Sequence, residues 1–205
     1  MNPNENLIIE CLNELNKNAL AKQKYKDYYE GNHSILKSYQ MQDSRSNMRL
    51  VFNFVRKFVD NESGYILGKP VNFISKSDDT AIITAIDKNI SHWDKVHNIN
   101  LRKQSEIYGE AYELNYVNTD GEFSATILTP LNAYVLEDGS AERNVVLALH
   151  TFTKKFDTTK YLDVYSANEI LHYELGSNSN KSSLNLIGSH EHIFGRVPED
   201  CMPRQ

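Results

Sequence analysis

Eight residues in the first third of the chain, GYILGKPV (64–71), contain the two glycines and the lysine expected of a phosphate-binding loop. Such a loop needs four residues between the glycines, then lysine and a serine or threonine, and it follows a β-strand. Here three residues separate Gly64 from Gly68, and Lys69 is followed by Pro70, which has neither a hydroxyl for magnesium nor an N–H for a phosphate. The preceding segment has helical spacing. We therefore interpret the stretch as a helix end, with Gly68 as C-cap and Pro70 preventing continuation.

Histidines offer a second kind of chemistry. In the segment His190-Glu191-His192, a strand would place two imidazoles on one face, which is half of a metal site. No third ligand is recognisable in the sequence, so a solvated strand end is the favoured interpretation. His92 and His97 are five residues apart, which separates them on a helix, and we interpret both as surface or packing residues.

Paired carboxylates are a third candidate. Glu106 and Glu110 flank Tyr108-Gly109 and would suit acid–base work if burial separated their pKa values. A helix end followed by a strand start is an adequate alternative explanation. No serine stands in a nucleophile-elbow context. The sequence therefore predicts no catalytic, metal-binding or cofactor-binding residues, and we expect the protein not to be an enzyme.

Basic and aromatic residues alternate near position 25. The members are lysines at 22, 24 and 26 and tyrosines at 25, 28 and 29. This pattern suits contact with a nucleic-acid backbone. It equally suits a solvated helix face whose tyrosines pack inward, and we favour that second interpretation.

The elements that position these residues change in kind along the chain. Apolar residues recur at helical spacing up to Tyr108 and alternate at strand spacing after Gly109. The predicted helices are 5–30, about 47–67, one that Asp78 or Asp79 caps with a stripe from Ile82 to Trp93, and about 98–108. The predicted strands are 71–75, 110–117, 122–128, 133–137, 145–153, 161–166, 169–175 and 184–187. Helices first and antiparallel strands second predict an α+β fold.

Composition limits the class of protein. A chain of 205 residues, 40% apolar and 24% charged, is long enough for one globular domain with a sizeable core. The net charge of −5 does not suggest a sequence-reading DNA-binding module, which usually has a basic face. Cys11 and Cys201 have no zinc-finger spacing and indicate a reducing cytoplasm. We expect no signal peptide and no membrane-spanning helix.

Five stretches occur in an order that resembles one family. They are YKDYYEGNHSIL (25–36), NMRLVFNFVRKFVDNESGYILGKPVNF (47–73), EIYGEAYELNYVNTDGE (106–122), TPLNAYVLED (129–138) and HIFGRVP (192–198). Together they resemble the tailed-phage portal proteins of the SPP1 type over about residues 25–198. The residues that carry the resemblance as a structural motif are Gly64, Tyr65, Gly68, Lys69, Pro70, Gly109 and Tyr112.

The resemblance implies a role in phage assembly and no catalysis. Members form a dodecameric portal ring, the head–tail connector, at one vertex of the procapsid. The terminase motor docks there, double-stranded DNA passes through without sequence specificity, and head-completion proteins bind later beside capsid and scaffolding proteins. The resemblance therefore implies a location in the virion at the portal vertex, and in the host cytoplasm during assembly, with no membrane and no cofactor.

The resemblance also implies a division of the chain. We expect an N-terminal helix and connector at 1–45, a portal wing-like α+β domain at 46–198 and an atypical tail at 199–205. Family members are usually much longer, and their stem, clip and crown would follow residue 198. We therefore expect a truncated chain that forms a monomer or a weak small oligomer. The alternatives are an enzyme of unknown class and a nucleic-acid-binding phage accessory protein.

Overall fold

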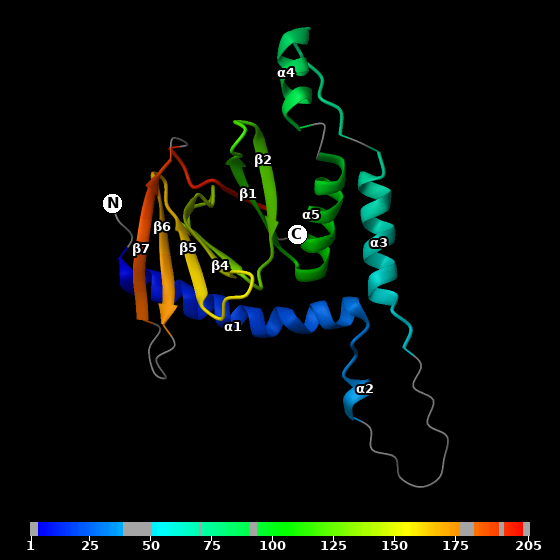
Figure 1. The fold of residues 1–205 in the computed structure, drawn as a ribbon. Helices are drawn as coiled ribbons and strands as arrows, with labels where there is room; N and C mark the ends of the chain where they lie inside the picture. Colours follow the sequence, from blue (N-terminus) through cyan, green and yellow to red (C-terminus); the bar gives the residue numbers. More distant parts are fainter. Residues whose placement is uncertain are drawn as a thin grey trace.

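A computed structural model of the chain describes residues 4–38, 51–69, 71–90, 94–176, 183–192 and 195–202. Helices come first and strands second, so the predicted α+β class is confirmed (Figure 1). The helices are α1 (Glu5–Glu30), α2 (Ile35–Ser38), α3 (Phe54–Leu67), α4 (Thr80–Ile90) and α5 (Asp94–Tyr108). The strands are β1 (Ala111–Val117), β2 (Phe123–Leu128), β3 (Ala133–Glu137), β4 (Val145–Thr153), β5 (Lys160–Tyr165), β6 (Glu169–Gly176), β7 (Ser183–Glu191) and β8 (Glu199–Met202).

The strands form two antiparallel sheets. One has five strands in the sequential order β3-β4-β5-β6-β7, and the other has three in the order β2-β1-β8. The hairpin between β1 and β2 closes through Asn118, whose Oδ1 accepts hydrogen bonds from the backbone of Asp120 and Glu122. Gly121 supplies the positive φ of 77° that the turn requires, as the sequence predicts.

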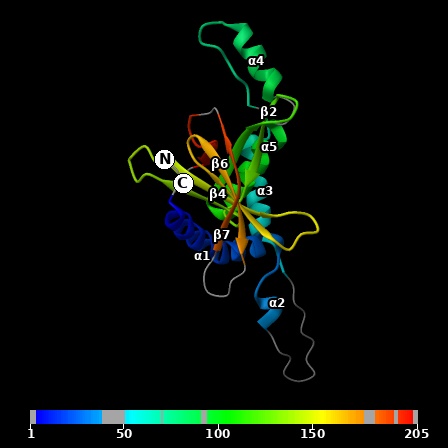
Figure 2. The ribbon, with the colours of Figure 1, turned by 60° about the vertical axis from the view of Figure 1, so that its left-hand side comes forward.

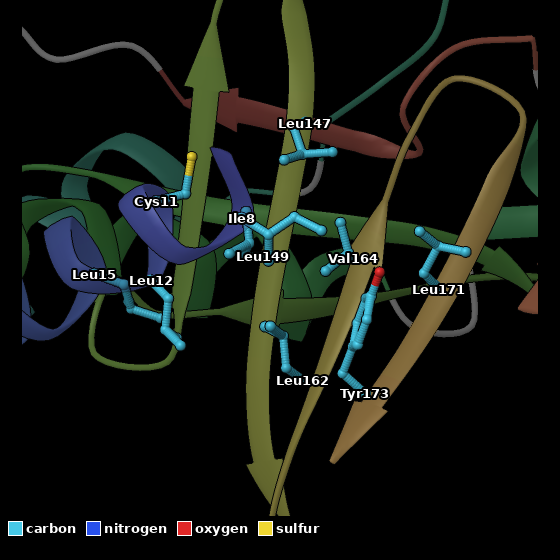
Figure 3. Close-up of a cluster of buried hydrophobic side chains, with 10 residues drawn as sticks. All are labelled: Ile8, Cys11, Leu12, Leu15, Leu147, Leu149, Leu162, Val164, Leu171 and Tyr173. Atoms are coloured by element: carbon cyan, nitrogen blue, oxygen red, sulfur yellow. The ribbon is translucent and has the colours of Figure 1, made fainter. Parts of the chain in front are cut away.

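Helix α1 runs beneath both halves of the molecule (Figures 1 and 2). Asn4 caps its first turn, and Gly31 ends it in the left-handed conformation that glycine adopts most readily. Apolar residues at helical spacing in its first half are buried against the five-stranded sheet. That cluster contains Ile8, Cys11, Leu12, Leu15, Leu147, Leu149, Leu162, Val164, Leu171 and Tyr173 (Figure 3). The main core therefore lies between one helix and one sheet face.

The opposite face of the five-stranded sheet meets the smaller sheet. Ala148, Tyr165 and Val197 are buried there, with Leu114 of β1 packed against them. Leu114 also packs on a second cluster around Tyr112, which makes the two clusters continuous. The smaller sheet thus covers part of a face that would otherwise be exposed.

Two predicted elements are corrected by the structure. Residues 71–75 form no strand: they pair with no strand among the described residues, and alternation of apolar and polar residues alone does not supply a partner. The second helix begins at Phe54, later than predicted, because Asn53 is its N-cap and residues 51–53 are not helical. Strand β8 was not predicted; it pairs with β1 from Leu114 to Ala111.

The junction between helices and sheets is built around one buried ion pair. The ammonium group of Lys22 in α1 lies 2.9 Å from Oε1 of Glu110 and donates a 2.5 Å hydrogen bond to the carbonyl of Tyr108. That carbonyl is one of the groups that the end of α5 leaves without an intrahelical partner. Gly109, at φ 78°, turns the chain between them, and its N–H bonds to the Ser105 carbonyl. Lys22 therefore fixes the point where the last helix becomes the first strand.

We predict that Lys22→Met lowers the free energy of unfolding by about 3–5 kcal/mol, because it removes the ammonium group that pairs with the buried Glu110 carboxylate. The side chains are only 17% and 8% exposed, so water cannot replace the lost partner. The double variant Lys22→Met/Glu110→Met should recover at least half of the loss. Urea unfolding followed by circular dichroism measures all three proteins.

Lys17→Met is the matched control, since its ion pair with Glu14 is 74% and 50% exposed. It should change the free energy of unfolding by less than about 0.5 kcal/mol. A Lys22→Met variant as stable as this control would contradict the structural role assigned to the buried pair.

Candidate functional site

The stretch GYILGKPV forms the end of α3 and the exit from it. Gly64 lies inside the helix, and Gly68 caps it, as the sequence predicts, although with φ −65° and not the left-handed conformation. A methyl group at position 68 would overlap the carbonyl oxygen of Gly64, whereas one at position 64 would meet no atom. Lys69 is exposed, and Pro70 lies outside the described residues. Glycine is thus required at position 68 by close packing.

Helix α3 presents its aromatic side to solvent. Phe54 is 57% exposed, Phe58 65% and Tyr65 92%, and the rings of Phe54 and Phe58 stack with centroids 6.4 Å apart. Phe52 extends the stack, at 6.1 Å from Phe54. We call these four residues the aromatic stripe. Aromatic side chains aligned on a helix surface normally face a core, so this stripe is an apolar surface that the subunit itself does not cover.

The opposite side of α3 buries Val59 and carries polar residues that contact the other helices. Asp60 accepts a 2.8 Å hydrogen bond from Lys103 of α5 and a 3.2 Å bond from the hydroxyl of Tyr29 in α1. One carboxylate therefore joins three helices. Burial, and then the charge of Asp60, raises the pKa of the Tyr29 hydroxyl, so it remains a hydrogen-bond donor at neutral pH.

Two further contacts fix the same side of α3. Ser63 is fully buried and donates to Glu106 of α5 at 3.3 Å, while Arg102 holds Glu106 at 2.7 Å. At the start of the helix, the side-chain amide of Asn53 donates to the Tyr29 carbonyl at 2.6 Å while its oxygen caps α3. Polar contacts thus orient α3 with its aromatic stripe outward.

The two carboxylates considered for acid–base work are separately engaged with cations. Glu106 pairs with Arg102, and Glu110 pairs with Lys22. Each is part of the packing between helices. The structure therefore places Glu106 and Glu110 in structural contacts on either side of Gly109.

The histidines also have separate neighbours. His190 is exposed at the edge of the sheet, with its ring 5.2 Å from that of His172, which in turn lies 2.6 Å from Asp163. His192 follows the end of β7 and donates to the Ser166 carbonyl at 2.8 Å. His97 is partly buried, with its Nε2 2.7 Å from Glu113, and His92 lies outside the described residues. Within the described part of the chain, no three His, Cys, Asp or Glu side chains are grouped so as to hold a metal ion.

The lysine and tyrosine segment of α1 is divided between the interior and the surface. Lys22 is used in the buried pair, Lys26 lies 3.8 Å from Glu30, and Lys24 lies over the Tyr28 ring. Tyr29 points into the helix layer, whereas Tyr25 is half exposed. Most of these side chains serve contacts inside the subunit.

Several contacts that orient α3 were missed by sequence reasoning. Arg102 and Glu106 are spaced i, i+4 on one helix, which is a detectable signal. Tyr29, Asp60 and Lys103 stand far apart in the sequence, and no local pattern joins them. No helix among the described residues is long and apolar enough to cross a membrane.

We predict opposite effects for two alanine substitutions in α3. Gly64→Ala should raise the free energy of unfolding by about 0.5–1 kcal/mol, because it replaces an exposed mid-helix glycine with a better helix former. Gly68→Ala should lower it by about 1–3 kcal/mol, because the new methyl group collides with the backbone. Urea denaturation measures both, and shifts in the same direction would contradict the packing at Gly68.

We predict that the Asp60 contact is lost in acid. Hydrogen bonding to Lys103 holds the pKa of Asp60 below its usual 3.8, so its contribution is fully present above that pH and disappears as the pH falls through the lower, native value. Because Asp60 is partly exposed, Asp60→Asn should cost at most about 1 kcal/mol at pH 7 and clearly less near pH 2. An equal cost at both pH values, measured by urea unfolding, would exclude the ionised form as the cause.

Known proteins are similar in sequence to most of this chain, including the helices described above. Residues 10–201 match the family described as phage portal protein, SPP1 Gp6-like, and this range includes α3, α5 and both sheets. The chain is also 24% identical over 136 residues to the portal protein of Bacillus phage SPP1. That alignment covers 64% of this chain and 26% of the relative, so the chain spans about a quarter of the length of the curated protein it matches. The chain belongs to the SPP1 Gp6-like family of phage portal proteins.

Proposed function

We propose that this protein is a structural subunit of a phage or prophage portal ring, through which double-stranded DNA is packaged and ejected. The family supports the proposal because its match extends over nearly the whole chain. The observation that carries it is the outward aromatic stripe of α3, an apolar surface that suits assembly with another protein. In this role the subunit acts by packing, and it needs no cofactor.

The partners in this proposal are those of a portal vertex. Other copies of the chain form a dodecameric ring, on which the terminase motor docks during packaging. Capsid and scaffolding proteins surround the ring, and head-completion proteins bind it afterwards. The ring forms in the host cytoplasm during assembly and remains in the virion.

The negative net charge of the chain is compatible with a channel through which DNA slides. A protein that neutralises many phosphates releases counterions and holds DNA tightly. This chain has a net charge of −5, and Lys22 is occupied by an internal ion pair. A weakly attractive surface would let the duplex pass without sequence preference.

The contacts of the candidate acid–base residues favour this structural role over an enzyme. Glu106 and Glu110 are each held by a cation at hydrogen-bond distance. Glu106 is thereby committed to contacts within α5 and with α3, and Glu110 to the contact between α1 and the start of β1. The alternative of a nucleic-acid-binding accessory protein would use Lys22 to contact a phosphate. Its ammonium group is already bonded to the Tyr108 carbonyl inside the subunit.

Immunogold electron microscopy tests the proposal in the phage or induced prophage that carries this gene. Antibody against the chain should label one vertex of each head, at the head–tail junction of finished particles. A nonsense mutation early in the gene should abolish the label and leave heads without DNA. Particles that lack the chain, or that carry it over the whole head surface, would contradict a portal role.

A further inference from the structure

A positive charge, the ammonium group of Lys57, lies beside the aromatic stripe. Lys57 lies on the exposed side of α3 next to Phe58, and no carboxylate of the described residues lies within ion-pair distance of its ammonium group. The acidic groups of the helix, Asp60 and Glu62, are paired with Lys103 and Arg102. The exposed surface of α3 is therefore apolar with a free cation at its side.

A second exposed apolar surface lies on the opposite flank of the molecule. Strand β7 is the last strand of the five-stranded sheet, and Figure 1 places it across the molecule from α3. Leu186 is 54% exposed and Ile187 56%. A shift in pairing opposite His172 and Tyr173 leaves Ile187 as an additional residue in the strand. Such a bulge hinders the addition of another strand but leaves the side chains free for packing.

This flank carries unpaired negative charge. Glu169 and Glu191 stand directly opposite each other on β6 and β7, an arrangement that is unfavourable for like charges. Neither carboxylate has a cation within ion-pair distance among the described residues. Glu5 is close by, because Glu5 and Glu169 both act on Tyr173, whose pKa is raised first by burial and then by these two charges. A cation from outside would relieve this repulsion.

The two surfaces match in length as well as charge. Lys57 and Tyr65 are eight residues apart on a helix, which is ~12 Å along the axis. Glu191 and Ile187 are four residues apart on a strand, which is ~14 Å. A helix lying along β7 would thus bring Lys57 to Glu191 and Tyr65 to Ile187 at the same time.

We propose that the aromatic stripe of α3 in one subunit packs against β7 of a second copy of this chain, with Lys57 paired to Glu191. This proposal rests on the proposed portal function and identifies the contact between neighbouring subunits. Because the two surfaces differ and lie on opposite flanks, the contact is head-to-tail, and repetition of it produces a ring when the rotation closes.

Mixing two blocked variants tests the contact directly. Phe58→Asp blocks the stripe and Ile187→Asp blocks β7, and both positions are exposed, so each variant should fold as the original does. In sedimentation velocity at rising concentration, the unmodified chain should form small oligomers. Each variant alone should stay a monomer, with the dissociation constant raised at least about 10-fold. Their equimolar mixture should form a dimer and nothing larger, because each still has one intact surface.

Charge exchange provides a control within the same chain. Lys57→Glu and Glu191→Lys should each weaken self-association, and the double variant should restore it, which loss of folding could not produce. Circular dichroism verifies the fold of each protein. A mixture of the blocked variants that stays monomeric, or a double variant no better than the single ones, would overturn the proposed contact.

Disulfide crosslinking is a second test of the contact that does not require a measured dissociation constant. Tyr65→Cys mixed with Ile187→Cys should give a disulfide between the two proteins, while each alone should give little. Both proteins also carry Cys201→Ser, which removes the second native thiol. Cys11 contributes little background, since burial raises the pKa of its thiol. Crosslinks within one variant and none between the two would overturn the contact. Immunogold labelling at the vertex would still support the portal role in that case, so the two proposals fail separately.

Discussion

The buried ion pair between Lys22 and Glu110 is the interaction on which the rest of this structure depends. It lies where α1, the end of α5 and the start of β1 meet, and its ammonium group also satisfies the last carbonyl of α5. A charge this deeply buried tolerates little displacement, because separation from its partner costs several kcal/mol. The direction in which β1 leaves α5 is consequently fixed relative to α1. Since β1 also packs against the five-stranded sheet through Leu114, the same pair sets the relation between the helices and both sheets.

Helix α3 shows how polar contacts can orient a surface that hydrophobicity alone would turn inward. Of its apolar residues, Val59 is buried, yet Phe58 and Tyr65 face solvent. Ser63 is fully buried, and Asp60 is hydrogen-bonded to residues of two other helices. Each buried polar group has a partner, so the inward side carries little desolvation cost. The exposed aromatic side is unfavourable for an isolated subunit. That cost is removed if a second protein covers it, which is the physical reason for treating the stripe as an assembly surface.

Local features of the fold could be predicted from the sequence, whereas the contacts between distant elements could not. The end of α1 at Gly31, the β1–β2 turn and the successive antiparallel strands depend on neighbouring residues, and the patterns located them well. The segment 71–75 has the alternation of a strand but no partner, and β8 pairs with β1 from the far end of the chain. The helical period of α3 was likewise visible, but not which side would face out. That depends on Tyr29, Asp60 and Lys103, which only the folded chain brings together. Whether the chain divides at 45 and 198 stays a prediction.

A ring requires that each subunit hold its two contact surfaces at a constant distance and angle, since a small error at every contact prevents closure. In this chain α1 is the element that links the aromatic stripe and β7.

The first half of α1 packs under the sheet that ends in β7. Its last turns bind α3 through the hydroxyl and the backbone carbonyl of Tyr29. With 26 residues it spans ~39 Å as one continuous helix, and a helix of that kind bends little. The buried core at one end and the polar contacts at the other keep it from sliding. The geometry between the stripe and β7 is therefore set by the length and anchoring of α1, so this fold has the rigidity that the proposed head-to-tail assembly demands.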